Sequence, residues 1–228
     1  MKRSKNYRSI AEKIQPGKEY PLSEAIAILK GTGTYKSDFS LEVHMNLGVD
    51  PRHSDQVVRG NVALPHGTGK KVRILVFAKG ELEKAATQAG ADFVGAEELV
   101  EKVKNGFLDF DVVVAHPDMM REVSKLGRVL GPKGLMPTPK TGTVTPQVGK
   151  AVKEVKGGRI EFKSDKTAGL HAVCGKLSFK EEALLENART VIKAVKDSKP
   201  ATSKGEYFKT VHIATTHGPG LKLNTGAL

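Results

Sequence analysis

The chain contains a single cysteine, no tryptophan and few aromatic residues of any kind. Of its 228 residues, 5% are Phe, Trp or Tyr. A single cysteine, Cys174, excludes a disulfide within the chain and is typical of a reducing compartment. It lies in the apolar stretch LHAVCGKL, which favours a buried small hydrophobe over a nucleophile. The scarcity of aromatic rings disfavours nucleic-acid binding by extensive base stacking.

The sequence also lacks any apolar run of the roughly 18 residues that a membrane-spanning helix needs. Its first segment, MKRSKNYRSIAEKIQPGKEY, carries basic residues with no apolar stretch behind them, unlike a secretory signal. We therefore expect a cytoplasmic protein that does not associate with a membrane.

Acidic residues are the minority among the charged ones. The chain has 25 Asp and Glu against 37 Lys and Arg, which gives a net charge of +12 and a pI near 9.7. Such an excess attracts polyanions over about a Debye length, roughly 8–10 Å at ordinary salt. RNA, DNA and anionic membrane are the candidate partners, and membrane is the weakest of them because no membrane segment is present.

Hydrophobic periodicity divides the chain into segments of two kinds. Residues 40–49 alternate between apolar and polar, which predicts a strand with one buried face in an antiparallel sheet. Between 71 and 156, apolar strands alternate with helical stretches, as in a parallel α/β sheet. The expected strands are 40–49, 57–64, 71–78, 92–94, 111–115, 159–163, 170–177 and 207–216. The expected helices are 22–30, with Ser23 as its N-cap, 80–90, 97–105, 118–125, 147–156 and 179–199.

This order predicts two domains of combined α/β and α+β class. An antiparallel α+β domain is built from both chain ends, residues 1–66 and 158–228, and an α/β domain, residues 67–157, is inserted in its middle. Both crossings contain glycines, which favours a hinge, although glycines also serve as simple turn residues.

Two basic segments are candidate phosphate contacts. The N-terminal arm carries Lys2, Arg3 and Lys5. A solvated tail is the competing interpretation. Residues 127–146 are rich in Gly, Pro and Thr and show no periodicity, which predicts a long loop stiffened by proline. Its basic residues include Arg128, Lys133 and Lys140. A stiff surface connection is the alternative for this loop.

Motifs for catalysis or metal binding are missing. The phrase HGTGKK at 66–71 lacks Walker spacing, because position 64 is Leu and position 71 is Lys. The seven histidines are scattered without an HExxH pair, and no G-x-S-x-G elbow occurs. We expect no enzymatic activity, metal or cofactor. A nucleotide-dependent enzyme using the inserted α/β domain is the alternative, although KGELEKA follows its first strand instead of a glycine fingerprint.

Two of the predicted strands carry polar faces that could bind a nucleic acid. The polar positions on or just before the first strand are Lys36, Ser40, Glu42 and His44. One face of the last strand presents Thr210, His212, Ala214 and Thr216. Small hydroxyls on a sheet can meet phosphates, ribose hydroxyls and base edges. Glu42 would repel RNA unless it accepts a hydrogen bond from a 2′-OH or a base amino group. An ordinary solvated face has the same pattern, and composition does not decide between the two.

Four long segments resemble, in order and at matching spacing, the L1 family of large-subunit ribosomal proteins of the bacterial type. They are LGVDPRHSDQVVRGNVALPHGTGK, LGRVLGPKGLMPTPKTGTVT, GRIEFKSDKTAGLHAVCGK and HIATTHGPG. The resemblance covers essentially the whole chain. It implies that the domain built from both ends binds 23S-type rRNA at the mobile L1 stalk, and that the inserted domain is Rossmann-like. It also implies a role in E-site tRNA release, translational repression through its own mRNA, a monomer when free, and neither enzymatic activity nor a cofactor.

The resemblance carries an RNA-contact cluster onto seven positions of this sequence. They are Lys36, Ser40, Glu42, Thr210, Thr216, His217 and Gly218. Two positions depart from the family pattern, in which Met commonly stands at the place of His217 and Phe at that of Ser37. An imidazole at 217 can still stack on a ribose or base, and it gains charge below about pH 6.5.

Overall fold

The computed structural model describes residues 5–15, 17–31 and 37–227. The chain forms two compact units: unit 1 is residues 1–69 with 160–228, and unit 2 is residues 70–159. The sequence predicts the boundaries a few residues earlier, after positions 66 and 157. Each unit is described by itself below.

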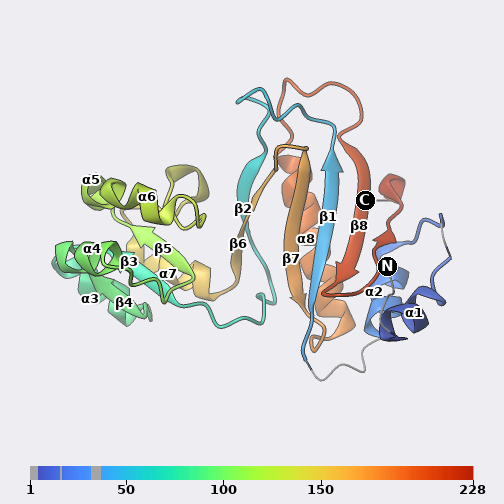
Figure 1. Cartoon of the computed structure of the whole chain (residues 1–228), viewed down its shortest axis with the longest axis horizontal. Helices are drawn as coiled ribbons and strands as arrows, with labels where there is room; N and C mark the ends of the chain where they lie inside the picture. Colours follow the sequence, from blue (N-terminus) through green and yellow to red (C-terminus); the bar gives the residue numbers. More distant parts are fainter. Residues whose placement is uncertain (1–4, 16, 32–36, 228) are drawn as a thin grey trace. The chain divides into compact units, whose positions relative to one another are not determined.

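Unit 1 is built on a four-stranded antiparallel sheet of order β7-β1-β8-β9 (Figure 1). At its centre, β1 (Ser40–Leu47) pairs with β7 (Gly169–Lys176) on one side and with β8 (Phe208–Thr215) on the other. The short β9 (Leu221–Lys222) pairs with β8 at the edge. Both chain ends therefore contribute to one sheet.

Two helices cover one face of this sheet. They are α2 (Leu22–Lys30) and α8 (Glu181–Asp197), which also pack against each other (Figure 1). Alternate strand residues point toward them and form the core of unit 1; in β1 these are Leu41, Val43, Met45 and Leu47. The period of two in the sequence follows from this arrangement, because helices cover the sheet on that side. A further helix, α1 (Lys5–Ala11), precedes α2.

A separate two-stranded sheet in unit 1 joins β2 (Arg59–Ala63) and β6 (Arg159–Lys163). The backbone N–H of Ser164 donates to the carbonyl oxygen of Val58 at 2.8 Å. The end of β6 therefore lies beside the start of β2, and the two strands run in opposite directions.

Unit 2 contains a three-stranded parallel sheet of order β4-β3-β5. Its strands are β3 (Ile74–Phe77), β4 (Phe93–Gly95) and β5 (Val112–Ala115). All four residues of β3 are buried, alternately in two apolar clusters, as in a sheet covered on both faces. Its helices are α3 (Glu81–Gln88), α4 (Glu97–Lys104), α5 (Met120–Val123), α6 (Gly127–Leu130) and α7 (Val148–Lys156). The predicted class, α/β combined with antiparallel α+β, is confirmed.

The segment 127–146 is more ordered than predicted. It contains α6 and the 3-10 turn η3 (Pro139–Thr141). The hydroxyl of Thr141 hydrogen-bonds to those of Thr138 and Thr143, at 2.9 and 3.0 Å. Hydrogen bonds between threonine side chains produce no periodic pattern of apolar residues in the sequence. For this reason, hydrophobic periodicity predicted a loop without regular structure here.

Two local predictions for helices are wrong. Ser23 is not an N-cap: α2 begins at Leu22, after Pro21, and no side chain caps it. The single helix expected over 118–125 is a succession of three short turns, η1 (Pro117–Met119), α5 and η2 (Ser124–Leu126). The last 3-10 turn of the chain is η4 (Thr225–Ala227).

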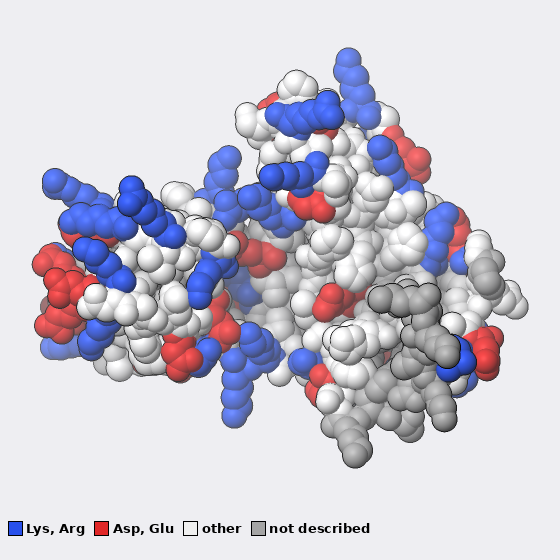
Figure 2. Space-filling view, in the orientation of Figure 1, with Lys and Arg blue, Asp and Glu red and all other residues white. Residues whose placement is uncertain are grey.

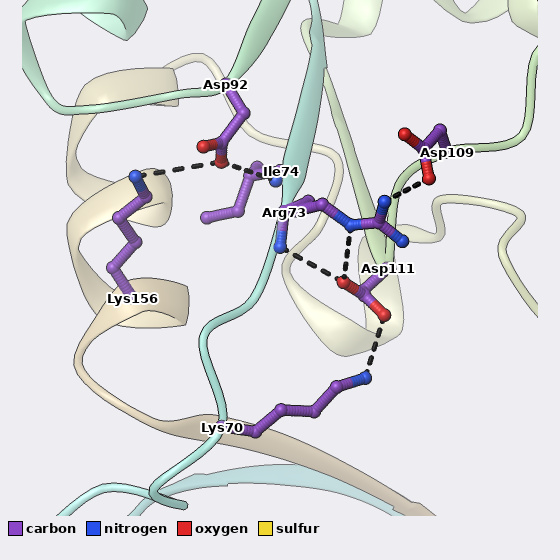
Figure 3. A network of polar contacts seen from close by, with 7 residues as sticks. All are labelled: Lys70, Arg73, Ile74, Asp92, Asp109, Asp111 and Lys156. Carbon is purple, nitrogen blue, oxygen red and sulfur yellow. Dashed lines mark hydrogen bonds and ion pairs between the residues drawn. The ribbon is translucent and has the colours of Figure 1, made fainter.

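A network of charged side chains holds the first strand of unit 2 in place (Figure 3). The carboxylate of Asp111, just before β5, accepts hydrogen bonds from Lys70 Nζ at 2.7 Å and from the N and Nε of Arg73 at 3.2 and 3.3 Å. Arg73 also pairs with Asp109. The hydrogen bonds from Lys70 and then from the Arg73 backbone lower the pKa of Asp111 to about 2.

Candidate nucleic-acid interface

The face of the four-stranded sheet opposite α2 and α8 is polar and partly accessible. We call it the open face. Its residues are Ser40, Glu42, His44 and Asn46 on β1, Gly169, His171 and Val173 on β7, and Thr210, His212 and Ala214 on β8. The side chains of Glu42 and His44 keep 36% and 33% of their surface exposed, so a ligand can reach both.

The strand register arranges these residues in rows across the sheet. Asn46 lies between Gly169 and Thr210. The next row is His171, His44 and His212, with Lys222 of β9 beyond it. The third row is Val173, Glu42 and Ala214. The single carboxylate of this face is thus next to the histidine row.

Ser40 and Thr216 are joined at one end of the open face. The N–H of Ser40 donates to Thr216 Oγ1 at 3.2 Å, and the N–H of Thr216 donates to the Ser40 carbonyl at 3.1 Å. Lys176 Nζ donates to the Ser40 hydroxyl at 3.0 Å. We call this group the Ser40–Thr216 pair. It holds two hydroxyls and an ammonium group in fixed positions, as a preformed site for phosphate or ribose requires.

A tight turn follows β8 at this end. The N–H of Gly218 donates to the carbonyl of Thr215 at 2.8 Å, and His217 between them has a φ of 63°. The imidazole of His217 meets the ring of Phe39 edge-on, with 6.0 Å between centroids. A Cβ on Gly218 would collide with the Thr215 hydroxyl, so the close turn requires glycine there.

The structure brings together only part of the predicted cluster. Ser40, Thr216, His217 and Gly218 meet at one end, with Glu42 two residues along β1. Thr210 shares the face but pairs with Asn46 near the opposite end of β1, about 20 Å from Thr216 at the ordinary rise of a strand. Lys36 lies outside the described residues, as do Lys2 and Arg3. Ser37 is exposed.

The remaining basic candidates lie elsewhere in the chain. The backbone of Lys5 begins α1 of unit 1. In unit 2, Arg128 is exposed on α6, Lys133 is exposed in the following turn, and Lys140 is exposed in η3. Their accessibility is compatible with phosphate contacts and with a solvated surface.

The sequence-based search missed what β7 and its neighbours add to this surface. His171 and Lys176 come from β7, and Lys222 comes from β9. A polar hollow of about 400 Å³ lies near the far end of β1, lined by Asn46, Arg52, Lys166, Thr167 and Lys209 among others. Lys and Arg side chains gather over this end of unit 1 in Figure 2. The signal in the sequence that could have revealed the β7 side of this face is the alternation of His171 and Val173 with apolar neighbours.

Burial and neighbouring charges set the titration of the open face. Burial, and then the adjacent His171, lower the pKa of His44, while Glu42 acts in the opposite direction with Oε2 3.9 Å from His44 Nε2. Burial, and then Lys222, lower the pKa of His212. Both shifts favour the neutral imidazole in the free protein.

A reactive thiol, a metal site and a membrane-spanning helix each place requirements on the described residues. Burial raises the pKa of Cys174 to about 12, so its thiol is unreactive. Across the described part of the chain, no three His, Cys, Asp or Glu side chains are grouped so as to hold a metal ion. None of the helices in that part is long and apolar enough to cross a membrane.

Comparison with known proteins gives consistent matches over nearly the whole length. The ribosomal protein L1p/L10e family matches residues 28–219. The large ribosomal subunit protein uL1 of Thermobifida fusca is 54% identical over 227 residues, which cover 100% of this chain and 97% of that protein. The protein of the same name from Solidesulfovibrio magneticus is 54% identical over 98% of this chain and 95% of its own length. That of Thermus thermophilus is 51% identical over 98% of both.

Proposed function

The chain belongs to the ribosomal protein L1p/L10e family, and on this basis we propose that it is a component of the large ribosomal subunit that binds structured ribosomal RNA. Membership of this family makes it a structural component rather than an enzyme. The alternative of a nucleotide-dependent enzyme is therefore set aside.

The observation that supports RNA binding most directly is the Ser40–Thr216 pair with its adjoining turn. Hydroxyl groups and backbone are held by hydrogen bonds between two neighbouring strands, so little conformational entropy is lost when a ligand docks. Such hydroxyl groups can bind phosphate and the 2′-OH, and the 2′-OH is the group that distinguishes RNA from DNA. Glu42, in the adjoining row, offers an acceptor for a 2′-OH or a base amino group.

The finer parts of the proposal rest on the sequence resemblance. We infer that the RNA is 23S-type rRNA of the L1 stalk, that the protein acts in E-site tRNA release, and that it represses translation by binding its own mRNA. Unit 1 supplies the specific contacts in this proposal. Arg128, Lys133 and Lys140 of unit 2, and Lys2, Arg3 and Lys5, add ionic contacts that position RNA without reading its sequence.

The experiment that tests the proposal compares a stalk-type rRNA fragment with a scrambled RNA of equal length, at two salt concentrations. We expect a preference of about a hundredfold, roughly 2.7 kcal/mol, that persists at the higher salt. Thr216→Val should reduce affinity for the stalk fragment by about tenfold, since it removes one hydroxyl from a fixed site.

A matched control is Thr190→Val, which makes the same change on α8, away from the open face. It should leave both affinities unchanged. Equal binding of the two RNAs, collapsing together as salt rises, would reduce the surface to a general polyanion binder. An undiminished affinity of Thr216→Val would remove the Ser40–Thr216 pair from the site.

A further inference from the structure

Three histidines form a row across the open face, and the site proposed above uses none of them. His171, His44 and His212 lie on three adjacent strands, in direct register. At ordinary strand spacing the row is roughly 10 Å long. His171 is exposed, and His44 and His212 are half-buried, so all three rings can be reached from the open face.

The first two rings of this row share a hydrogen bond. Nδ1 of His44 and Nδ1 of His171 are 2.8 Å apart, with the ring centroids separated by 5.0 Å. Such a contact needs one ring to donate and the other to accept, so the pair carries a single proton on these two nitrogens. A further proton on the accepting nitrogen would break this hydrogen bond, because both Nδ1 atoms would then be donors.

The charged groups around the row come from three segments of unit 1. Glu42 on β1 favours the protonated form of His44, and Lys222 on β9 disfavours that of His212. Asp165, in the turn before β7, interacts with His171. His44 and His212 also repel each other when charged. Burial thus disfavours the charged forms of His44 and His212 in the free protein.

We propose that His171, His44 and His212 form a second RNA contact, in which the row binds the phosphate backbone and takes up protons as the RNA docks. The inference rests on the proposed function, because RNA on the Ser40–Thr216 pair would bring phosphates over the neighbouring rows. A phosphate beside the row adds negative charge to that of Glu42, and so favours the imidazolium forms. Protonated rings then donate charge-assisted hydrogen bonds to phosphate oxygens.

Proton uptake makes affinity depend on pH. For each proton taken up, the affinity rises by up to about tenfold for each unit by which the pH falls. At constant ionic strength, we expect the Kd of the stalk-type fragment to fall by about tenfold between about pH 7.5 and 6.0. Calorimetric titration in two buffers of different ionisation enthalpy should give an uptake of about one proton near pH 6.5.

The test compares the parent with the triple variant His44→Gln, His171→Gln, His212→Gln. The affinity of the variant should differ least from that of the parent at about pH 8, where imidazolium is least favoured, and the variant should lose most of the pH dependence. His66→Gln is the matched control: it removes an imidazole that pairs with Glu186, away from the open face, and should keep the parental pH dependence. His217 is unchanged in the parent and in both variants, so it contributes equally to all three measurements.

The possible outcomes distinguish failure of the histidine contact from failure of the proposed function on which it rests. A parent that fails to prefer the stalk fragment at about pH 8 overturns the proposed function itself. If the parent prefers the stalk fragment but the triple variant shows the same pH dependence as the parent, only the histidine contact is overturned. A loss of affinity that is equal at every pH would also contradict it, since that is contact without proton uptake. If the triple variant does not fold, His212→Gln alone should lower the proton uptake, because it leaves the 2.8 Å pair intact.

Discussion

At the scale of single residues, the turn after β8 is the most constrained part of the candidate site. His217 occupies the left-handed region at φ 63°, which costs a non-glycine residue on the order of 1 kcal/mol. The next residue, Gly218, has no room for a side chain against Thr215. The addition of a single methyl group at position 218 is therefore expected to disturb this proposed binding turn.

Gly218→Ala should therefore lower affinity for the stalk-type RNA by about tenfold, because the added Cβ displaces the turn. Binding to scrambled RNA should change little. Gly220→Ala is the matched control, since a Cβ at that nearby position meets nothing within 4 Å. Filter binding or fluorescence anisotropy measures both, and equal affinities of the two variants would separate the turn from RNA recognition.

The alternation of the sequence predicted which side chains face outward, but it could not predict register. Ser40 and Thr216 are 176 residues apart and hydrogen-bonded, whereas Thr210, on the strand β8 that precedes Thr216, lies at the far end of the face. Pairing between distant segments sets that register. On β7 the period of two holds from Gly169 to Cys174 and is interrupted only where a bulge buries both Cys174 and Gly175.

At the scale of elements, a buried asparagine connects α8 to the rest of unit 1. Asn187 is fully buried; its Oδ1 accepts from the N–H of His66 at 3.2 Å, and its Nδ2 donates to the carbonyls of Gly67 and Cys174 at 3.0 and 2.8 Å. The amphipathic stripe of this helix was predictable from its sequence. The asparagine within it was not, because its partners lie in two distant segments.

Asn187→Ala should lower the free energy of unfolding of unit 1 by about 2–4 kcal/mol, since it leaves buried backbone groups without partners. Urea unfolding followed by circular dichroism measures this. Asn46→Ala, at an exposed position, should stay within about 0.5 kcal/mol of the parent. If Asn187→Ala lowers the free energy of unfolding by no more than Asn46→Ala does, then water satisfies the backbone groups that Asn187 binds.

The strand that opens unit 2 depends on ionised carboxylates. The pKa of Asp111 is lowered to about 2 from an ordinary value of 3.8, so folding favours its charged form. The stabilisation that the charged Asp111 gives to the fold is complete when the pH is above its ordinary pKa of 3.8, and it is lost as the pH falls toward 2. Asp92 adds a second carboxylate contact to this strand by accepting from the N–H of Ile74 at 2.9 Å (Figure 3).

Asp111→Asn should lower the free energy of unfolding of unit 2 by about 1–2 kcal/mol at pH 7, after allowance for solvent screening. The difference from the parent should shrink between about pH 5 and pH 2, where Asp111 itself becomes protonated. Denaturant unfolding at about pH 7 and pH 3 checks both statements. A difference that stays constant with pH would show that packing, not charge, accounts for the loss.

At the scale of the whole molecule, positive charge is distributed over both units. Residues 70–159 contain 16 Lys and Arg and 11 Asp and Glu, a net +5 of the total +12. Figure 2 shows basic and acidic side chains interspersed on the visible face of each unit. Such a distribution attracts RNA in general and carries little sequence information. In the proposed function, selectivity therefore comes from the open face of unit 1.

Unit 1 has the features of a part that folds without the inserted segment. Its core cluster draws every residue from 1–69 and 160–228. β2 and β6 are adjacent antiparallel strands, so a short linker can replace residues 70–158 at the ends that lie side by side. The division into two units was predictable because the kind of periodicity changes twice along the chain.

A chain in which a short Gly-Ser linker replaces residues 70–158 should unfold cooperatively and should keep the preference for stalk-type over scrambled RNA. Its absolute affinity should fall, because Arg128, Lys133 and Lys140 are removed. If these three side chains neutralise phosphates, the plot of log K against log salt concentration becomes less steep by about 2–3 units, at about 0.9 for each contact. Substituting the same three residues by Ala in the full chain should reproduce the change in slope. A folded unit 1 that loses its preference would assign recognition to both units, and an unchanged slope would identify the segment around Lys133 as a stiff surface connection.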